Sequence, residues 1–534
     1  MLDRLKRALH RIYRPTQHRE SPGQGGQPSN GPKTPLTGDL AQDKEWLKAT
    51  LGASFDFQCR ELEIGQKPSW RAALLYFDGL VDKELIDLGF LRSLLQEIPL
   101  AARPVGDRQG LLPQIKVRFL NVADVREAES YEELVDDVLA GNAALLADGC
   151  KKALILGVPG WEHRQVSEPA DESVIRGPRD GFVETLRVNT ALIRRRIKDP
   201  ALRLEGYKIG RRTKTEVVVT YLQGIADDKI VEEVRRRLLR IDIDGILESG
   251  YLEELIEDAP YSPFAQMGNT ERPDRLSACL LEGKVGILVD GSPIALKIPI
   301  TFTETFQASD DYYERFWLAT FLRWIRFINF LVALLLPSFY IALTTYHQEL
   351  IPSPLLISIA AAREGIPFPA VLEAFLMETT LEVMREAGLR LPKPIGNAIS
   401  IVGALVLGQV AVATGLVSAT MVVVVGYTAI ATFISPRYSF MIPIRLLRFP
   451  MMILAGTLGL FGVMVGFLAV HIHLMSLRSF GVPYMMPLAP MNWNDLKDIL
   501  IRAPWWALRT RPVLNRVQEL RRQRAGAGPK PEAQ

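Results

Sequence analysis

The sequence predicts an α/β cytoplasmic region of two subdomains followed by an α-helical polytopic membrane domain. Up to about Arg315, apolar runs of strand length alternate with helical patterns, which is typical of a soluble α/β protein. From Phe316 onward the chain carries long uncharged runs of the length that crosses a bilayer. A mean hydropathy of +0.10 also favours a mixture of soluble and membrane parts.

Composition narrows the class of protein. The chain has 534 residues, of which 48% are hydrophobic, and its net charge is +3. The high apolar fraction and the small net charge exclude a disordered protein. Three cysteines that lie far apart in the sequence exclude a small domain held together by disulfides.

Residues 1–40 are predicted to be disordered. A short basic amphipathic stretch, residues 1–14, is followed by a segment rich in Gly, Pro and polar side chains that cannot form a core. The alternative for residues 1–14 is a foothold on a membrane surface, which we disfavour because their apolar face is small.

The soluble region is predicted to divide into an α/β subdomain at residues 41–145 and a second one at 146–315, with the boundary near 140–149. Strands are expected at 70–77, 152–158 and 216–221, and helices at 82–97, 181–198 and 228–239. Residues 286–290 and 294–298 flank Asp290-Gly-Ser-Pro293, which is typical of a hairpin turn.

The membrane domain is predicted at residues 316–490. Its spans are expected at 327–345, 395–412, 416–434 and 451–474, because these runs are uncharged and long enough to cross a bilayer. Residues 354–386 contain charges and two prolines, so they are interpreted as a re-entrant, interfacial or broken segment.

Basic residues set the expected topology. Arg315, Arg323 and Arg326 precede the first span, so the soluble region is expected in the cytoplasm. Residues 491–534 form a basic tail, also expected there. Four crossings satisfy both ends but put the basic loops 385–393 and 437–448 outside. Six crossings would correct this by using charged segments, and four are favoured.

The chain lacks the motifs of common enzymes. It has no G-x-x-x-x-G-K-[ST] loop, no G-x-S-x-G and no H-E-x-x-H. His471 and His473 stand two apart and would point to nearly opposite sides of a helix, so interfacial histidines are favoured over a metal site. We expect no enzymatic activity, no catalytic residue, no cofactor and no metal. The basic tail favours lipid headgroups over nucleic acid as its partner.

Small residues recur every four positions in two predicted spans, which lets helices approach closely. They are Ser400, Ala404 and Gly408 in one span, and Gly462 and Gly466 in the other. Packing within the chain and a seam between copies of the chain are equally favoured.

Three polar residues around the turn between two spans are candidates for a pore or gate: Gln409, Thr414 and Ser418. A local role in the helix turn is the alternative.

An acidic stripe lies on one predicted helix. Glu378, Glu382 and Glu386 stand four residues apart and would form a cation-attracting acidic vestibule if several copies surrounded an axis. The favoured alternative is a solvated helix face neutralised by Arg385 and Arg390.

Taken together, nine stretches resemble one family, the A subunits of the nutrient (germinant) receptors of bacterial endospores. They are RGPRDGF (176–182), RRRI (194–197), TERPD (270–274), EGKVGILVDGSP (282–293), DYY (311–313), AREGIPFP (362–369), EAGLRLP (386–392), IVGALVLGQ (401–409) and LRSFGVPY (477–484). The resemblance runs from about residue 70 to 490 and leaves out the first forty residues and the tail.

The resemblance implies a multi-pass subunit of the spore inner membrane, with its N-terminal region and C-terminal tail in the cytoplasm. Such subunits assemble with a permease-like B subunit and a lipoprotein C subunit, and are thought to form a homo-oligomer that conducts cations when a nutrient is sensed. The alternative is a non-conducting scaffold, or an amplifier subunit that acts with the dipicolinic-acid release machinery. Residues 478–490 look more like the receptor branch.

Overall fold

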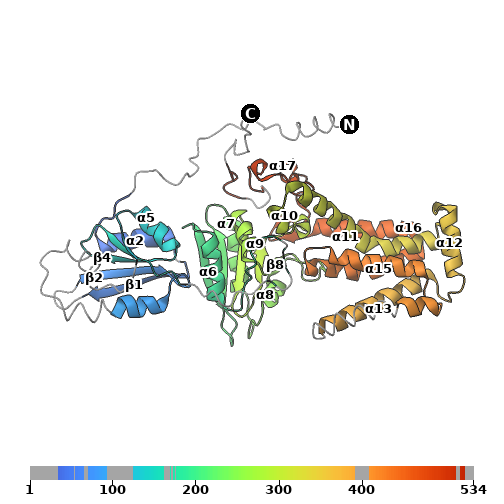
Figure 1. Ribbon diagram of the computed structural model, residues 1–534, viewed down its shortest axis with the longest axis horizontal. Helices are drawn as coiled ribbons and strands as arrows, with labels where there is room; N and C mark the ends of the chain where they lie inside the picture. The colour runs from blue at the N-terminus through green and yellow to red at the C-terminus, as the bar shows by residue number, and fades with distance from the viewer. Residues whose placement is uncertain are drawn as a thin grey trace, which may run out of the picture.

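The computed structural model describes residues 34–52, 54–64, 70–92, 124–160, 169, 172, 174, 176–390, 408–512 and 517–523. The molecule is elongated, with one sheet at one end, a second sheet in the middle and a group of long helices at the other end (Figure 1). This order follows the order of the sequence, except that the C-terminal tail returns to the middle.

The first sheet is antiparallel, with strand order β1-β2-β4-β5-β3. Its strands are β1 (Phe57–Ile64), β2 (Trp70–Phe77), β3 (Val125–Ala128), β4 (Ala143–Ala147) and β5 (Ala153–Leu156). Helices α2 (Leu40–Leu51) and α5 (Tyr131–Leu139) cover the face that carries Leu75, and η1 (Leu85–Leu91) covers the face that carries Leu74. Neighbouring leucines therefore face opposite sides, as the two-residue repeat of a strand requires.

The second sheet is also antiparallel, with strand order β6-β7-β9-β10-β8. Its strands are β6 (Leu202–Ile209), β7 (Thr215–Leu222), β8 (Gly268–Thr270), β9 (Val285–Val289) and β10 (Ala295–Ile298). Helices α6 (Leu186–Arg196) and α9 (Pro273–Leu281) cover the face of Val218, while α7 (Asp228–Leu239) and α8 (Ser249–Ile256) cover the face of Val217 and Val219.

Several sequence predictions for the soluble region are confirmed. The strand at 70–77 and the helix at 228–239 have the predicted bounds, and β9 and β10 pair as the predicted hairpin. The expected helix at 82–97 is a shorter π-helix, η1, and residues 93–97 lie outside the described residues.

The two predicted subdomains exist, but their boundary is later than expected. Strands β4 and β5 pair with each other in the first sheet, so a division at 145/146 would cut through β4. The change of sheet falls between Leu156 and Leu202. A buried ion pair joins the two units: both carboxylate oxygens of Asp56 accept from Arg194, at 2.7 and 3.0 Å.

Residues 34–40, which are predicted from the sequence to be disordered, are part of the folded first subdomain. Leu36 is buried, and the carboxylate of Asp39 accepts a hydrogen bond from the backbone N–H of Ala41 at the start of α2. An aspartate in this position satisfies an otherwise unpaired N–H of the first helical turn. Residues 1–33 lie outside the described residues.

The helical end contains α11 (Phe316–Thr345), α12 (Ser353–Arg363), α13 (Ala370–Arg390), α15 (Ala419–Phe433) and α16 (Tyr438–Ser476). Among the described residues, two helical stretches are long and apolar enough to cross a membrane, 316–345 and 439–476. The predicted span at 416–434 corresponds to α15, which has 15 residues. Most of the predicted span at 395–412 lies outside the described residues.

Helix α16 turns back on itself inside the span predicted at 451–474. Gly459 has φ 63° and ψ −143°, a backbone conformation that is essentially restricted to glycine. A Cβ atom on Gly466 would lie 2.4 Å from Sδ of Met451, a residue that would be about 22 Å away along a straight helix. The two halves of α16 therefore run antiparallel.

Contacts at the helix ends show the direction of each half. The hydroxyl of Ser439 bonds to Oδ1 of Asn269 at 3.5 Å, and Nε2 of His473 bonds to the hydroxyl of Ser262 at 2.9 Å. Both ends of α16 thus lie against the second sheet's subdomain. The turn lies beside the end of α11, where the hydroxyl of Tyr346 donates to the carbonyl of Gly456 at 2.9 Å.

The chain after α16, including the tail, packs on the soluble part. It forms a small hairpin of β11 (Arg478–Ser479) and β12 (Val482–Pro483), then α17 (Trp493–Leu496) and the 3-10 turn η6 (Trp505–Ala507). Phe480 and Val482 join the core of the second sheet, and Nε of Arg511 donates to the carbonyl of Leu281 at 2.9 Å. The predicted separate unit at 491–534 is thus, over its described residues, part of the central subdomain.

Candidate functional site

Four glutamates lie along α13, the helix that packs against α11, α15 and α16: Glu373, Glu378, Glu382 and Glu386. Glu373 and Glu378 are fully buried, Glu382 is half-buried and Glu386 is exposed. Carboxylates inside a group of apolar helices are costly unless they are paired, so each partner matters.

Glu373 caps the start of α15. Its Oε1 accepts from the backbone N–H of Ser418 at 2.5 Å and from the Ser418 hydroxyl. That hydroxyl in turn accepts from the backbone N–H of Met421 at 3.2 Å. A carboxylate at a helix N-terminus is favoured by the helix dipole. Ser418, a predicted pore residue, is thus a buried helix cap in this structure.

Glu378 forms an ion pair with Arg448 of α16. The distance from Nη1 to Oε2 is 2.5 Å, and both side chains are 1% exposed. Nε of Arg448 also donates to the carbonyl of Ala333 at 2.9 Å, so one guanidinium connects α16 to α13 and α11. Within the described part of the chain, Oε1 of Glu378 and Nη2 of Arg448 have no hydrogen-bond partner.

The outer glutamates are paired as well. Glu382 accepts from Arg445 of α16, at 3.1 Å from Nε, and from Arg385, at 3.3 Å from Nη1. Glu386 pairs with Arg390, four residues along the same helix, and both are exposed. Pairing with arginines agrees with the favoured alternative to an acidic vestibule, although the inner glutamate Glu378 is not solvated. The vestibule across several chains stays a prediction.

The other predicted residues lie apart from this stripe. Gln409 and Thr414 are exposed, and the Thr414 hydroxyl donates to the carbonyl of Val410 at 2.8 Å, within its own helical turn. A Cβ on Gly408 would lie 3.7 Å from Val422. Gly462 and Gly466 face the first half of α16, so they allow close packing inside the chain. Ser400 and Ala404 lie outside the described residues.

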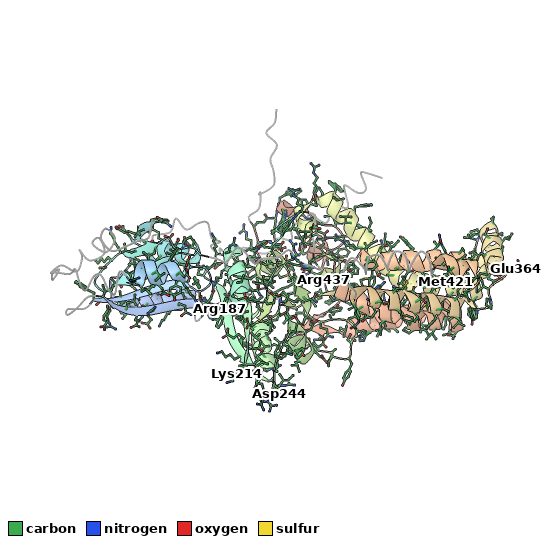
Figure 2. The ribbon with its side chains drawn as sticks, turned by 60° about the horizontal axis from the view of Figure 1, so that its bottom comes forward. Arg187, Lys214, Asp244, Glu364, Met421 and Arg437 are labelled. Carbon is green, nitrogen blue, oxygen red and sulfur yellow. The ribbon has the colours of Figure 1, made fainter. Side chains whose placement is uncertain are left out.

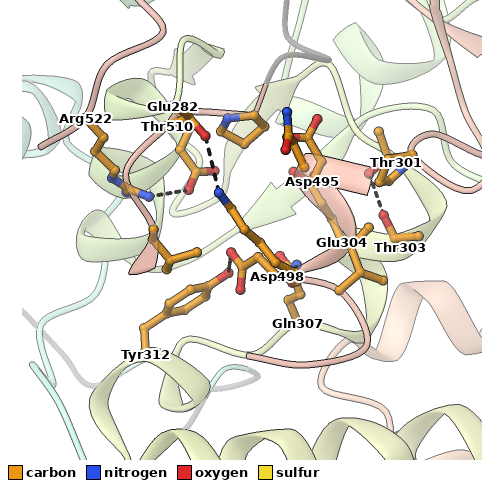
Figure 3. A pocket seen from close by; sticks show the side chains of 16 residues that line it. Glu282, Thr301, Thr303, Glu304, Gln307, Tyr312, Asp495, Asp498, Thr510 and Arg522 are labelled. Atoms are coloured by element: carbon orange, nitrogen blue, oxygen red, sulfur yellow. Dashed lines mark hydrogen bonds and ion pairs between the residues drawn. The ribbon is translucent and has the colours of Figure 1, made fainter. Parts of the chain in front are cut away.

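A second charged cluster lies where α11 leaves the soluble part. The buried carboxylate of Asp311, in α10 (Asp310–Tyr313), accepts from Nε of Arg323 at 3.0 Å and from Nη1 of Arg326 at 2.8 Å. Nη1 of Arg323 also bonds to Oδ1 of Asp498 in the tail, at 3.1 Å. Figure 3 shows the adjoining cavity of about 60 Å³, where the Tyr312 hydroxyl donates to Asp498 at 2.9 Å.

Aromatic packing supports the same junction. Phe302 and Phe306 of η4 (Phe302–Phe306), Phe330 of α11 and Phe440 of α16 stack or meet edge to face, with ring centroids 5.3–5.7 Å apart. The soluble part and the helices therefore meet through a joint of rings and ion pairs. In the part of the chain that the structure describes, no group of three or more His, Cys, Asp or Glu could hold a metal ion.

Sequence reasoning missed Glu373, the basic partners Arg445 and Arg448, and the Asp311 cluster. Glu373 stands five residues before Glu378 and so breaks the four-residue repeat. Arg445 and Arg448 were considered only as basic residues of a loop, whereas α16 begins at Tyr438 and carries both into the bundle. One sequence signal could have found the two arginines. Arg445 and Arg448 directly precede a long apolar run, and the chain also contains a helix with a row of glutamates that such arginines could neutralise.

Comparison with known proteins identifies the family. The model of the Bacillus/Clostridium GerA spore germination protein matches residues 45–514. The chain belongs to the GerA spore germination family. It is 43% identical to spore germination protein KA of Bacillus subtilis, covering 93% of this chain and 90% of that protein. It is 44% identical to the uncharacterized membrane protein YfkQ of the same organism, covering 90% and 91%.

A solved structure is also similar, the N-terminal domain of the A subunit of the Bacillus megaterium spore germinant receptor GerK3. It is 36% identical, covers 51% of this chain and 99% of its own, and superposes with a TM-score of 0.41. Membership of the GerA family gives this chain a role in spore germination, and the family together with the apolar helices makes it a membrane protein. The resemblance found in the sequence is thereby confirmed.

Proposed function

We propose that this protein is the A-type subunit of a spore germinant receptor and that its helices conduct cations once a nutrient has been sensed. The observation that carries the proposal is the row of glutamates on α13, two of which, Glu378 and Glu382, pair with arginines of α16, in a chain of the GerA family. Buried ionisable residues among apolar helices are costly and usually serve a pathway or a switch. The partners of the proposed complex are a permease-like B subunit, a lipoprotein C subunit and further copies of this chain.

Six membrane crossings fit this proposal better than the four favoured from the sequence. Each half of α16 is about 17–21 residues long, or roughly 25–31 Å, which is close to a bilayer core. Helix α13 runs from the Glu373–Ser418 contact to Arg385, which lies near Thr432 at the end of α15. Helices α13 and α15 therefore run the same way, and we propose one further crossing between them.

This arrangement also accounts for the basic residues. The ends of α13 and α15 and the start of α16 lie on the side of the soluble part, where Arg385, Arg390, Arg437 and Arg445 gather. Basic residues concentrate on the cytoplasmic side of membrane proteins. We accordingly propose that the soluble region and the tail lie in the cytoplasm of the spore, beneath its inner membrane.

Cation flux through the purified protein tests the conducting role. We expect liposomes that contain the protein with its B and C partners to release potassium when the nutrient is added. Replacing Gln409 or Thr414 with lysine should lower the flux about tenfold or more without reducing assembly, because a fixed positive charge opposes cations in a low-dielectric path. Leu239→Lys, a charge added at an exposed position of α7, is the matched control.

The possible results of that flux experiment lead to different conclusions. Unchanged flux in an assembled Gln409 or Thr414 variant would remove those two positions from the pore. If the liposomes retain their potassium with every partner and the nutrient present, the result would instead favour the second candidate. That candidate is a non-conducting scaffold, or an amplifier that acts with the dipicolinic-acid release machinery.

A further inference from the structure

A cavity lies at the junction between the central subdomain, the tail and the start of α16. Its volume is about 160 Å³, and its walls come from α9, β10, the segment that follows η4, and Arg437. At about 30 Å³ for each water, it holds several waters or one group of the size of phosphate. Figure 2 shows Arg437 between the soluble part and the helices, with Glu364 at the opposite end of the helices.

Arg437 is the unusual side chain in this cavity. It is 5% exposed, and within the described ranges its Nε and Nη2 have no hydrogen-bond partner. A guanidinium has five N–H donors and stays charged in proteins, and buried polar groups are almost always hydrogen-bonded. Glu172 and Glu304 attract this charge from a distance, but the two nitrogens lack an acceptor. Buried donors without acceptors are unfavourable, so the cavity favours an acceptor that carries negative charge.

Lys297 of β10 lines the same cavity and is 2% exposed. The hydrogen bond that its ammonium group makes with the described residues is a long one, 3.8 Å, to Sγ of Cys279. It faces Cys279 and Arg275 of α9, Glu304 of η4 and Arg437. Burial, with a smaller effect of Arg437, lowers the pKa of Lys297 to about 7.

Three carboxylates line the same cavity, and each has a cationic partner of its own. Asp274 pairs with Arg272 at 2.8 Å, Glu282 with Arg522 at 3.4 Å, and Glu304 with Lys284, while Oε2 of Glu304 has no hydrogen-bond partner among the described residues. Glu172 likewise forms an ion pair with Arg275 at 2.5 Å. Although burial opposes it, attraction to Lys284 and Lys297 lowers the pKa of Glu304 to about 2, so this carboxylate is ionised. Arg437 and Lys297 therefore remain as two cationic groups without a carboxylate of their own in the described part of the chain.

We propose that this cavity binds a phosphate-type oxyanion, held by the guanidinium of Arg437 and the ammonium group of Lys297. Guanidinium groups match the oxygen geometry of such anions, and a lysine adds a compact charge. Because Arg437 immediately precedes α16 and Lys297 belongs to the second sheet, the anion would connect the soluble part to the first membrane-directed turn of α16. Occupancy would thereby bias the position of that helix.

Calorimetric titration of the purified full-length protein with inorganic phosphate tests the proposal. We expect the wild type to bind and Arg437→Gln to bind about ten- to a hundredfold more weakly, since hydrogen bonds to charged groups contribute that much. Arg240→Gln, at an exposed position after α7, should bind like the wild type. Equal affinities in all three proteins, or no binding by the wild type up to tens of millimolar, would overturn the proposal.

A second variant keeps the test decisive if Arg437→Gln fails to fold. Sulfate, whose charge is constant near neutrality, should bind the wild type more weakly as the pH rises through about 7, because Lys297 loses its proton there. Lys297→Met should bind weakly at every pH. Undiminished, pH-independent binding by Lys297→Met would also overturn the proposal.

Two sources could supply the anion, and further titrations separate them. Mixed micelles that contain phosphatidylglycerol are compared with micelles of phosphatidylcholine, in the wild type and in Arg437→Gln. If micelles that contain phosphatidylglycerol bind and inorganic phosphate does not, and this binding is lost in Arg437→Gln, the site is assigned to a lipid headgroup. If inorganic phosphate binds and this binding is lost in the same variant, the site is assigned to a soluble phosphate compound.

Discussion

Replacing Arg448 with alanine is expected to destabilise the helical end by about 3–5 kcal/mol, the usual cost of removing one partner from a buried ion pair. The change leaves the carboxylate of Glu378 buried and unpaired, and it removes the hydrogen bond to the carbonyl of Ala333. For a unit of 150–250 residues the loss corresponds to a fall of roughly 6–20 °C in Tm. Heat-induced unfolding of the purified protein in detergent would measure it.

Two controls isolate the cause of this loss. Arg390→Ala removes the partner of an exposed glutamate, Glu386, and should cost less than about 1 kcal/mol. The double change Glu378→Leu with Arg448→Met removes both charges and should recover most of the stability, because apolar replacement of a buried pair is often neutral. A Tm of Arg448→Ala equal to that of Arg390→Ala would contradict the central position given to this pair.

Replacing Asp311 with alanine is expected to disconnect α11 from the soluble part. Arg323 and Arg326 would lose their shared carboxylate, and Arg323, whose side chain is 2% exposed, would keep only Asp498 as an ionic partner among the described residues. We expect a loss of about 3–5 kcal/mol in the unfolding of the helical end. The soluble part should be affected less, because its two sheets have separate cores.

Nutrient response should fall together with that stability. We expect spores that carry Asp311→Ala to contain the protein but to germinate slowly, because a signal cannot pass through a loosened joint. Limited proteolysis near α10 and the rate of germination are the two readouts. Asp244→Asn, at a position whose side chain is 81% exposed, is the matched control. Germination of Asp311→Ala spores at the control rate would show that the joint does not transmit the signal.

Regular elements with strong patterns could be predicted from the sequence. The run WRAALLYF in β2 and the periodic charges of α7 determine their bounds by themselves. Strand β1 was missed because three of the eight residues in its sequence FQCRELEI are charged, as suits a strand at the edge of a sheet. The predicted boundary between the subdomains was too early in the sequence. Strands β4 and β5 belong to one sheet because they pair with each other, and no local sequence pattern reveals that pairing.

Prediction of the helical end from the sequence was limited for a different reason. The reversal at Gly459 lies inside an uninterrupted apolar run, so hydropathy alone predicts one long helix there. The glycines at 462 and 466 were recognised as packing residues, but the identity of their neighbour depends on the turn. The acidic stripe and its neighbours Arg385 and Arg390 were visible, whereas Arg445 and Arg448 lie about sixty to seventy residues from the glutamates that they pair with. Tertiary contacts, rather than local preference, decide this region.

Potassium release from spores after nutrient addition tests the central claim most directly. The parent strain is compared with a strain that lacks this gene and its paralogues, and with the same strain after the gene is restored together with its B and C partners. We predict that early release is lost in the deletion strain and returns on restoration, which assigns the protein to the triggering step. Early release that persists undiminished in the deletion strain would contradict that assignment.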